Sequence, residues 1–314
     1  YSLGSYDFTA NADVFSKVLL IIMVVQAFIA FDVMLRGVRA VMRLRYDHAS
    51  MLVVLTLACA VDAVLAIRAG RVPFCPAVTL QLSMALLGEY SMQLAKEAVR
   101  IFSEKIGSYP FSQLKIVHCF MYSAMEYPGL CMIGMPDVKD FRKIDKNSCG
   151  GLEAHVPHEI AHQWFYAAIG NDSYKEPWLD EGFCEFCEDV LFPYYANKKL
   201  QKKLWSDKYS TRKDMDRWFR KIVIPQSSRT KAINRSVSDY QDKPDEYSNS
   251  VYEGGKLFLY ELWKTMGDKT FFQMLHKYYQ TYQFQIVTTN DFLTMVRQYQ
   301  GGEKVERIIR KYVR

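Results

Sequence analysis

Two histidines four residues apart, His158 and His162, limit what this chain can be more than any other feature of its sequence. Residues at positions i and i+4 of a helix lie on one face about one turn apart, so both imidazoles can reach the same cation. A carboxylate follows 19 residues after the second histidine, at Glu181. Two imidazoles, one carboxylate and a fourth position open to water form the His2Glu type of catalytic zinc site. The pattern therefore predicts one Zn2+ per chain, bound by these three residues.

Further carboxylates accompany this pattern. Glu159 lies between the two histidines, where it can take a proton from a water that the metal activates. Glu181, Glu185 and Glu188 recur at helical spacing and therefore share one face. We expect Glu188 to orient one of the zinc-binding histidines through its other ring nitrogen, and Glu185 to be solvated. The alternative, that the histidines are ordinary core or surface residues, is weakened by the carboxylate at Glu181.

The sequence around these residues resembles the gluzincin metallo-aminopeptidases related to aminopeptidase N. Their motif is a His-Glu-x-x-His helix, eighteen residues and a Glu, and His158, His162 and Glu181 match that spacing. The segment Trp178-Leu-Asp-Glu-Gly-Phe183 is similar as well. The resemblance covers about residues 89–314 and implies a thermolysin-like α+β domain. In that fold a small sheet holds the substrate on its edge strand, and a helical lobe follows.

The segment Ser123–Gly129 resembles the Gly-Ala-Met-Glu-Asn exopeptidase motif of that family, with Ser123 and Tyr127 replacing the Gly and the Asn. The resemblance implies that Glu126 binds the free α-amino group of the substrate, beside Ala124 and Met125. A carboxylate against an ammonium would fix the chain end, so that only the first peptide bond reaches the metal. Taken alone, this Glu would be a turn residue. We expect the following segment, Leu130–Gly134, to be the edge strand along which substrate extends.

Tyr252 begins a Tyr-Glu-Gly-Gly segment that resembles the family's Tyr-Glu-x-Gly segment, whose Tyr stabilises an oxyanion. The family often has Lys where Gly254 stands. A Tyr at the start of a helix is otherwise a packing residue, so this role comes from the resemblance. Taken together, the resemblance implies a zinc aminopeptidase whose partner is a peptide with a free N-terminus.

Two other functions stay open at this point. A zinc endopeptidase would not need Glu126 and would cleave N-blocked peptides. A membrane transport or scaffold subunit could keep a peptidase-like domain that only binds peptides, but it would be indicated by a lost zinc ligand or base, and none is lost here. Family members usually carry a β-rich domain before the catalytic one, so we expect either an excerpt of a longer protein or a fusion to a membrane protein.

The first 88 residues differ in composition from the rest. They contain 12 charged residues, against 62 in residues 89–314. Three apolar runs lie in this segment: Val18–Phe31, Met51–Ile67 with one Asp, and Val72–Gly88 with two prolines. A membrane-spanning helix needs about 20 apolar residues, with about 17 as the lower limit. The runs predict two or three transmembrane helices in contact with lipid, with buried helices of a soluble domain as the alternative.

The arginines between the first two runs bear on topology. Arg36, Arg39, Arg43 and Arg45 would lie in the cytoplasm by the positive-inside rule. Two spans would then place residues 89–314 outside the cytoplasm, and three would place them inside. The seven cysteines show no disulfide-framework spacing, which favours a reducing compartment. The protein is therefore predicted at a membrane, with its side left open.

One basic segment could suggest a nucleic-acid partner. Residues 198–231 are rich in Lys and Arg and contain aromatic residues, but acidic residues are interleaved among them. This pattern favours a solvated helical face, and no nucleic-acid partner is expected. The sequence leaves the oligomeric state open.

Overall fold

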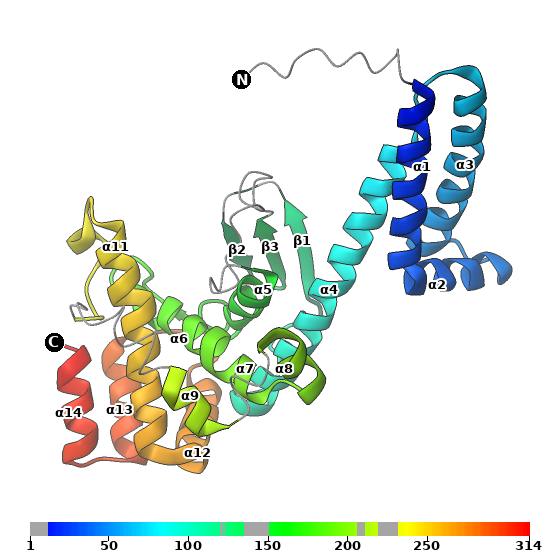
Figure 1. The fold of residues 1–314 in the computed structure, drawn as a ribbon. Helices are drawn as coiled ribbons and strands as arrows, with labels where there is room; N and C mark the ends of the chain where they lie inside the picture. The colour runs from blue at the N-terminus through cyan, green and yellow to red at the C-terminus, as the bar shows by residue number, and fades with distance from the viewer. Residues whose placement is uncertain (1–11, 120, 122, 135–150, 206–210, 219–231) are drawn as a thin grey trace. The chain divides into compact units, whose positions relative to one another are not determined.

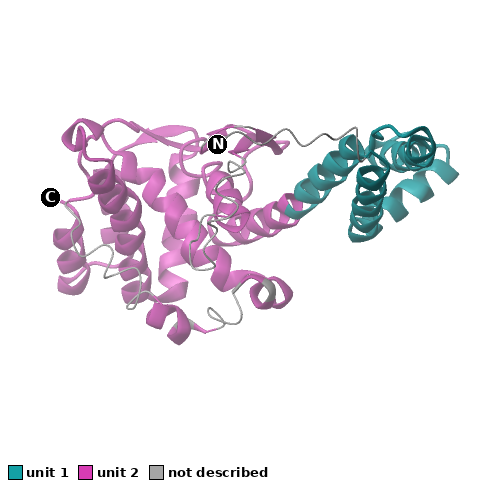
Figure 2. Cartoon of the chain, turned by 45° about the horizontal axis from the view of Figure 1, so that its top comes forward, with its two compact units in different colours: residues 1–90 teal, residues 91–314 magenta. Residues whose placement is uncertain are grey.

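A computed structural model gives the structure of residues 12–119, 121, 123–134, 151–205, 211–218 and 232–314 (Figure 1). The chain divides into two compact units, Tyr1–Tyr90 and Ser91–Arg314 (Figure 2). Helix α4 (Cys75–Lys105) contributes to both units, and the Gly88–Glu89 boundary expected from composition falls inside it.

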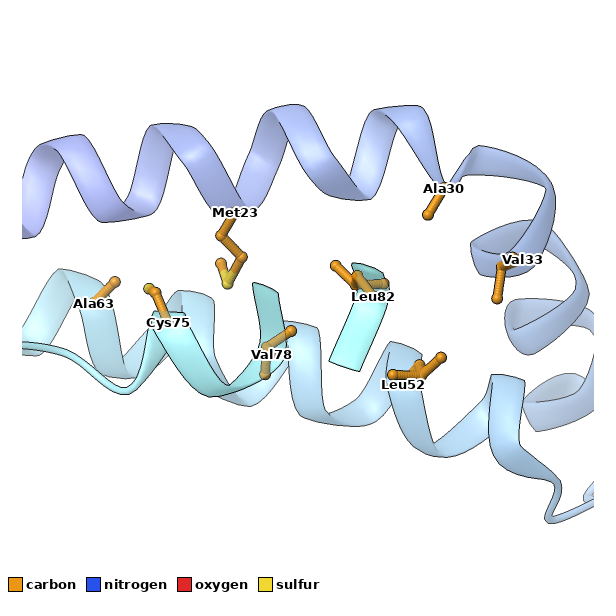
Figure 3. Packing of buried hydrophobic residues seen from close by; sticks show 8 residues of the cluster. All are labelled: Met23, Ala30, Val33, Leu52, Ala63, Cys75, Val78 and Leu82. Carbon is orange, nitrogen blue, oxygen red and sulfur yellow. The ribbon is translucent and has the colours of Figure 1, made fainter. Parts of the chain in front are cut away.

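The first unit consists of helices that surround a narrow core. Its helices are α1 (Ala12–Ile29), α2 (Phe31–Met42), α3 (His48–Ala69) and the first part of α4. The capping box of Asp47 and Ser50 starts α3, and Gly70 in the left-handed region, at φ 64°, ends it. Met23 of α1 points toward α3 and α4, where it packs with small and branched side chains such as Ala63 and Val78 (Figure 3).

The outer surface of this unit is apolar. Ile21 is 61%, Phe28 76% and Leu57 63% exposed, although a water-soluble bundle would cover most such side chains. Among the described helices, α1 and α3 are long and apolar enough to cross a membrane. The third predicted run lies in α4, which does not meet that criterion over its described length.

The second unit begins with a small mixed sheet. Its strands are β1 (Lys115–Cys119), β2 (Ala124–Tyr127) and β3 (Leu130–Gly134). Their order is β1-β3-β2, with β1 parallel and β2 antiparallel to β3. The prediction that Leu130–Gly134 forms the edge was therefore wrong, because this strand is paired on both sides. Within the described residues β2 is an edge strand, so the segment that carries Glu126 takes that position itself.

Helices make up most of the remainder of the second unit (Figure 1). They are α5 (Leu152–Ala161), α6 (Glu181–Phe186), α7 (Phe192–Tyr195), α8 (Lys198–Trp205), α9 (Arg212–Trp218), α11 (Pro244–Tyr247), α12 (Gly255–Tyr282), α13 (Thr289–Tyr299) and α14 (Glu303–Tyr312). Short 3-10 helices cover Pro177–Leu179 and Val237–Tyr240, and π-helical segments cover Cys187–Leu191 and Ser248–Gly254. A two-stranded parallel ladder joins β4 (Ile169–Asn171) to β5 (Gln285–Val287).

The architecture is thus mixed and dominated by helices, which agrees with the expected α+β class at that coarse level. Of the basic stretch 198–231, helices α8 and α9 are described, whereas residues 206–210 and 219–231 lie outside the described residues. An aromatic cluster joins α6 to α12 and α13. In it the Phe183 ring lies 6.2 Å from that of Tyr278 and 5.1 Å from that of Phe292.

Candidate metal centre

Helix α5 and the first turn of α6 bring three ligand atoms together. His158 Nε2 lies 3.2 Å from Glu181 Oε2, and His162 Nε2 lies 3.4 Å from the same oxygen. These atoms are all within 4.8 Å of one another. His162 follows the last residue of α5 but keeps helical dihedrals, with φ −60° and ψ −15°, so the two imidazoles still share a face. The geometry agrees with the spacing argument from the sequence.

The other ring nitrogens of both histidines also have partners. His158 Nδ1 lies 3.0 Å from Glu188 Oε2, and His162 Nδ1 can donate to the Phe165 carbonyl at 3.2 Å. A partner on Nδ1 fixes the ring orientation and leaves Nε2 to face a cation. Burial opposes charge on His158, yet its hydrogen bonds with Glu181 and Glu188 raise its pKa well above the ordinary value. The same carboxylates supply the negative potential that a divalent cation requires.

Glu159 provides a test of whether these residues suit a metal. Its side chain is buried, and its Oε2 has no hydrogen-bond partner among the described residues. Burial raises the pKa of this carboxyl to about 7, although His158 and His162 oppose the shift. Buried carboxylate oxygens are rarely left without a partner, so the site has room for a group that the polypeptide does not supply. The donor set and this orphaned oxygen together fit a metal and its water.

Glu126 of β2 lies beside this group. Ligand atoms of Glu126, Glu159 and His162 are all within 4.8 Å of one another. Side chains alternate along a strand, so Ala124 shares the face of Glu126, while Met125 points to the opposite face and is 40% exposed. The structure therefore brings Glu126 to the site and leaves the Met125 side chain away from it.

Gln163, which follows His162 directly, ties the β2–β3 hairpin to the end of α5. Its Oε1 accepts a hydrogen bond from the Gly129 N–H at 2.7 Å, and its Nε2 donates to the Tyr127 carbonyl at 3.0 Å. The side chain is fully buried, which makes both bonds costly to lose. This role could not be predicted from the sequence, because the bonds join residues more than thirty positions apart. Gln163 thus fixes the strand of Glu126 against the helix of the histidines.

Tyr252 reaches the site from the π-helical segment that precedes α12. Its ring lies 6.3 Å from that of His158 and nearly parallel to it, at 15°. Burial and then the Glu181 carboxylate raise the pKa of this phenol well above its ordinary value. The hydroxyl therefore stays protonated and can donate a hydrogen bond to an anion.

Two glycines set how closely α6 and α12 approach. A Cβ added at Gly182 would lie 2.8 Å from the Cα of Gly255, closer than real Cβ contacts. Glu181 directly precedes the first glycine, and Tyr252 lies three residues before the second. The two side chains are brought together because the two backbones touch.

A buried ionic cluster lies behind His158, and the sequence did not reveal it. Lys256 is 1% exposed, and its Nζ lies 3.0 Å from Glu185 Oε2 and 2.9 Å from Glu253 Oε1, with Asp189 as a third partner. The expectation that Glu185 is solvated was wrong, because this carboxylate pairs with Lys256 and lies 3.8 Å from His158 Nδ1. The i, i+3 spacing of Glu253 and Lys256 was the only local signal.

A His2Glu donor set with a buried carboxylate beside it is characteristic of zinc-dependent hydrolases. The family described as "Peptidase family M1 domain" matches residues 90–312, and the chain belongs to this family. Membership confirms the resemblance to gluzincin metallo-aminopeptidases. The members of this family are peptidases, and the donor set of this chain suits a Zn2+ cofactor.

Curated relatives match this chain at low identity. The chain is 27% identical over 212 residues to Aminopeptidase O of Homo sapiens, which covers 61% of this chain and 24% of the relative. It is 25% identical over 217 residues to Aminopeptidase N of Streptomyces lividans, which covers 67% of this chain and 24% of the relative. The chain thus spans about a quarter of the length of these relatives.

A solved structure shares the fold. The M1 zinc metallopeptidase from Deinococcus radiodurans superimposes with a TM-score of 0.50 at 24% identity, over 70% of this chain and 43% of that chain. At this level of identity the likeness concerns the fold alone.

Proposed function

We propose that this chain is a zinc aminopeptidase, which removes one amino acid from the free N-terminus of a peptide. The observation that carries the proposal is the position of Glu126, whose carboxylate lies within 4.8 Å of ligand atoms of Glu159 and His162. A carboxylate on an edge strand beside the proposed base and metal ligand is where a substrate's α-ammonium would bind, with the first peptide carbonyl next to it. The names of the curated relatives support the same activity.

His158, His162 and Glu181 would hold the metal. When bound there, Zn2+ supplies Lewis acidity toward the scissile carbonyl and lowers the pKa of a water. Glu188 keeps the His158 ring in place through Nδ1, at 3.0 Å. The chain's own residues then determine where protons and substrate go.

Glu159 acts as the general base and then as the general acid. Its carboxylate lies beside the ligands that would hold the metal, so it can accept a proton from the attacking water and return it to the leaving amine. Tyr252 donates its hydroxyl proton in a hydrogen bond to the oxygen on which negative charge develops. Its raised pKa keeps that donor protonated.

Substrate would lie along β2, the strand at the described edge of the sheet. An extended peptide can pair with such an edge through its backbone groups, which adds affinity without a side-chain preference. Glu126 then fixes the register, because its charge pairs with the α-ammonium. Only the first peptide bond would reach Glu159 in that register.

The first unit supports a proposed attachment to a membrane. We propose that α1 and α3 span the bilayer, because both combine sufficient apolar length with exposed apolar surface. The alternative, that these are buried helices of a soluble domain, predicts release by alkaline carbonate extraction. The spanning proposal predicts that the chain stays with the membrane.

Amino acid release from a free peptide and from its N-acetylated form tests the enzymatic proposal. The full chain with Zn2+ should cleave only the free peptide, and Glu159→Gln should abolish cleavage. Glu126→Ala should reduce release from the free peptide, whereas Glu303→Gln on α14, which is exposed, should change nothing. Equal cleavage of both peptides would favour an endopeptidase. Absence of cleavage by folded, zinc-loaded protein would favour the peptide-binding subunit.

A further inference from the structure

Helix α2 is held in one rotational position against α3. Val33, Gly37 and Ala40 form its buried side. A Cβ added at Gly37 would lie 2.2 Å from the Ala49 carbonyl oxygen of α3, so the two helices touch at this glycine. The remaining sides of α2 therefore face away from α3 in a defined direction.

One of these outer sides is an apolar stripe. Phe31, Leu35, Val38 and Met42 follow one another at i, i+4, i+7 and i+11, which places them along one face of the helix. Phe31 is 56%, Val38 45% and Met42 80% exposed. Leu35 is half-buried, and the other three side chains stay largely exposed among the described residues of the first unit.

The adjacent outer side is a basic stripe. Arg36, Arg39 and Arg43 follow at i, i+3 and i+7, and all three are exposed. Arg36 pairs with Glu89 at 2.7 Å, whereas Arg39 and Arg43 form no ion pair with residues that the structure describes. Asp32, at the start of the helix, is the acidic residue on this side, so the stripe keeps a positive charge.

The position of α2 in the chain agrees with an interfacial location. A single residue, Ala30, separates α1 from α2, and five residues separate α2 from α3. Figure 1 shows α2 running across the ends of α1 and α3. If those two helices cross a bilayer, α2 has to lie at one of its surfaces, since the connections are too short to carry it elsewhere.

We propose that α2 is an interfacial helix that binds anionic phospholipid. Its apolar stripe enters the boundary between headgroups and acyl chains, and its basic stripe contacts the headgroup phosphates. This inference rests on the proposed membrane insertion of α1 and α3 and adds the lipid class that the surface selects. The arginines also mark the leaflet in which α2 lies.

Photo-crosslinking of the full chain in phosphatidylcholine nanodiscs tests this inference. Trace phosphatidylglycerol or phosphatidylcholine with a photoactivatable acyl chain is added, and labelled peptides are identified by mass spectrometry. The phosphatidylglycerol probe should label residues 31–42 more strongly than the phosphatidylcholine probe. The combined variant Arg36→Gln, Arg39→Gln, Arg43→Gln should reduce that preference about thirtyfold, because Arg39 and Arg43, which form no ion pair with described residues, contribute about 1 kcal/mol each.

A matched control removes three basic residues from another amphipathic helix. Lys304→Gln, Arg307→Gln and Arg310→Gln on α14 remove the same charge and should leave labelling of α2 unchanged. Labelling of α1 and α3 by phosphatidylcholine should persist in both variants, which shows that the first unit is folded and inserted.

The outcomes separate the two proposals. Labelled α1 and α3 with an unlabelled α2, or a phosphatidylglycerol preference that survives the arginine variant, would overturn the inference on α2 alone. If neither α1 nor α3 is labelled, the membrane proposal fails and the inference fails with it. A variant with Phe31→Ser and Val38→Ser should lower acyl-chain labelling of α2 by both probes.

Discussion

Phe28 in the first unit leaves 76% of its surface exposed, while Lys256 in the second unit leaves 1%. In a water-soluble domain the usual distribution is the reverse, with Phe inside and Lys outside. Each exception calls for a particular environment. The apolar surface of the first unit suits lipid, and the buried cation of the second unit is surrounded by Glu185, Asp189 and Glu253.

The comparison shows that solvent exposure has a different meaning in the two units. Exposed apolar residues in the first unit form continuous helical faces, which indicates that an apolar medium such as lipid surrounds them. Buried charges in the second unit occur next to the candidate metal centre, where burial shifts the pKa of Glu159 and Tyr252.

The largest expected effect concerns the buried carboxylate without a partner. Glu159→Gln keeps the shape of the side chain but removes its proton-accepting charge, so kcat should fall about 10³-fold. The zinc content of the variant, measured by elemental mass spectrometry, should equal that of the unmodified chain. A variant with activity within about tenfold of the unmodified chain would rule out Glu159 as the base.

The next effect concerns Lys256. Lys256→Met leaves three buried carboxylates without their cation, and should lower the free energy of unfolding of the second unit by about 3 kcal/mol. All five Trp residues lie in that unit, so Trp fluorescence during urea unfolding reports on it alone.

Lys304→Met, on the exposed side of α14, is the control for that substitution and should change stability by less than about 0.5 kcal/mol. Adding Glu185→Met and Asp189→Leu to Lys256→Met should recover part of the loss, because the remaining apolar side chains can pack. Equal losses for Lys256→Met and Lys304→Met would contradict the buried-cluster interpretation.

A smaller effect is expected at Glu188. Glu188→Gln weakens the partner of His158 Nδ1 and should reduce zinc affinity about 10- to 100-fold. Competition with a chelator of known affinity measures this change, and Glu303→Gln, whose side chain is 68% exposed, serves as the control. Unchanged affinity would mean that Glu185, 3.8 Å from the same nitrogen, orients the ring instead.

The smallest expected effect tests whether the two units are independent of each other. Phe28→Ser on α1 should reduce retention in the membrane after carbonate extraction, yet change unfolding of the second unit by less than about 0.5 kcal/mol. Met23→Ser, at a buried position of the same helix, should instead disturb the packing of the first unit. A clear shift in the Trp-reported transition for Phe28→Ser would show that the two units do not unfold independently.

Features that depend on spacing within one short segment of the chain could be predicted from the sequence. The histidine pair, the following Glu181 and the apolar runs are all repeats along one helix or fixed spacings in the chain. Features that depend on contacts between distant segments could not be predicted. Lys256 meets Glu185 across 71 positions, and the central place of β3 depends on its parallel pairing with β1. Glu126 was found only through the resemblance to a family.

The contact of Gly182 with Gly255 has a consequence for how the site tolerates change. The backbones at Gly182 and Gly255 are in van der Waals contact, and this contact sets the distance between Glu181 and Tyr252. That distance therefore does not depend on the rotamer of any side chain between them. A single methyl group at either glycine would push both helices apart and shift the metal ligand and the phenol at once. Substitutions of the side chains around this contact should therefore be tolerated, whereas almost no residue can replace Gly182 or Gly255.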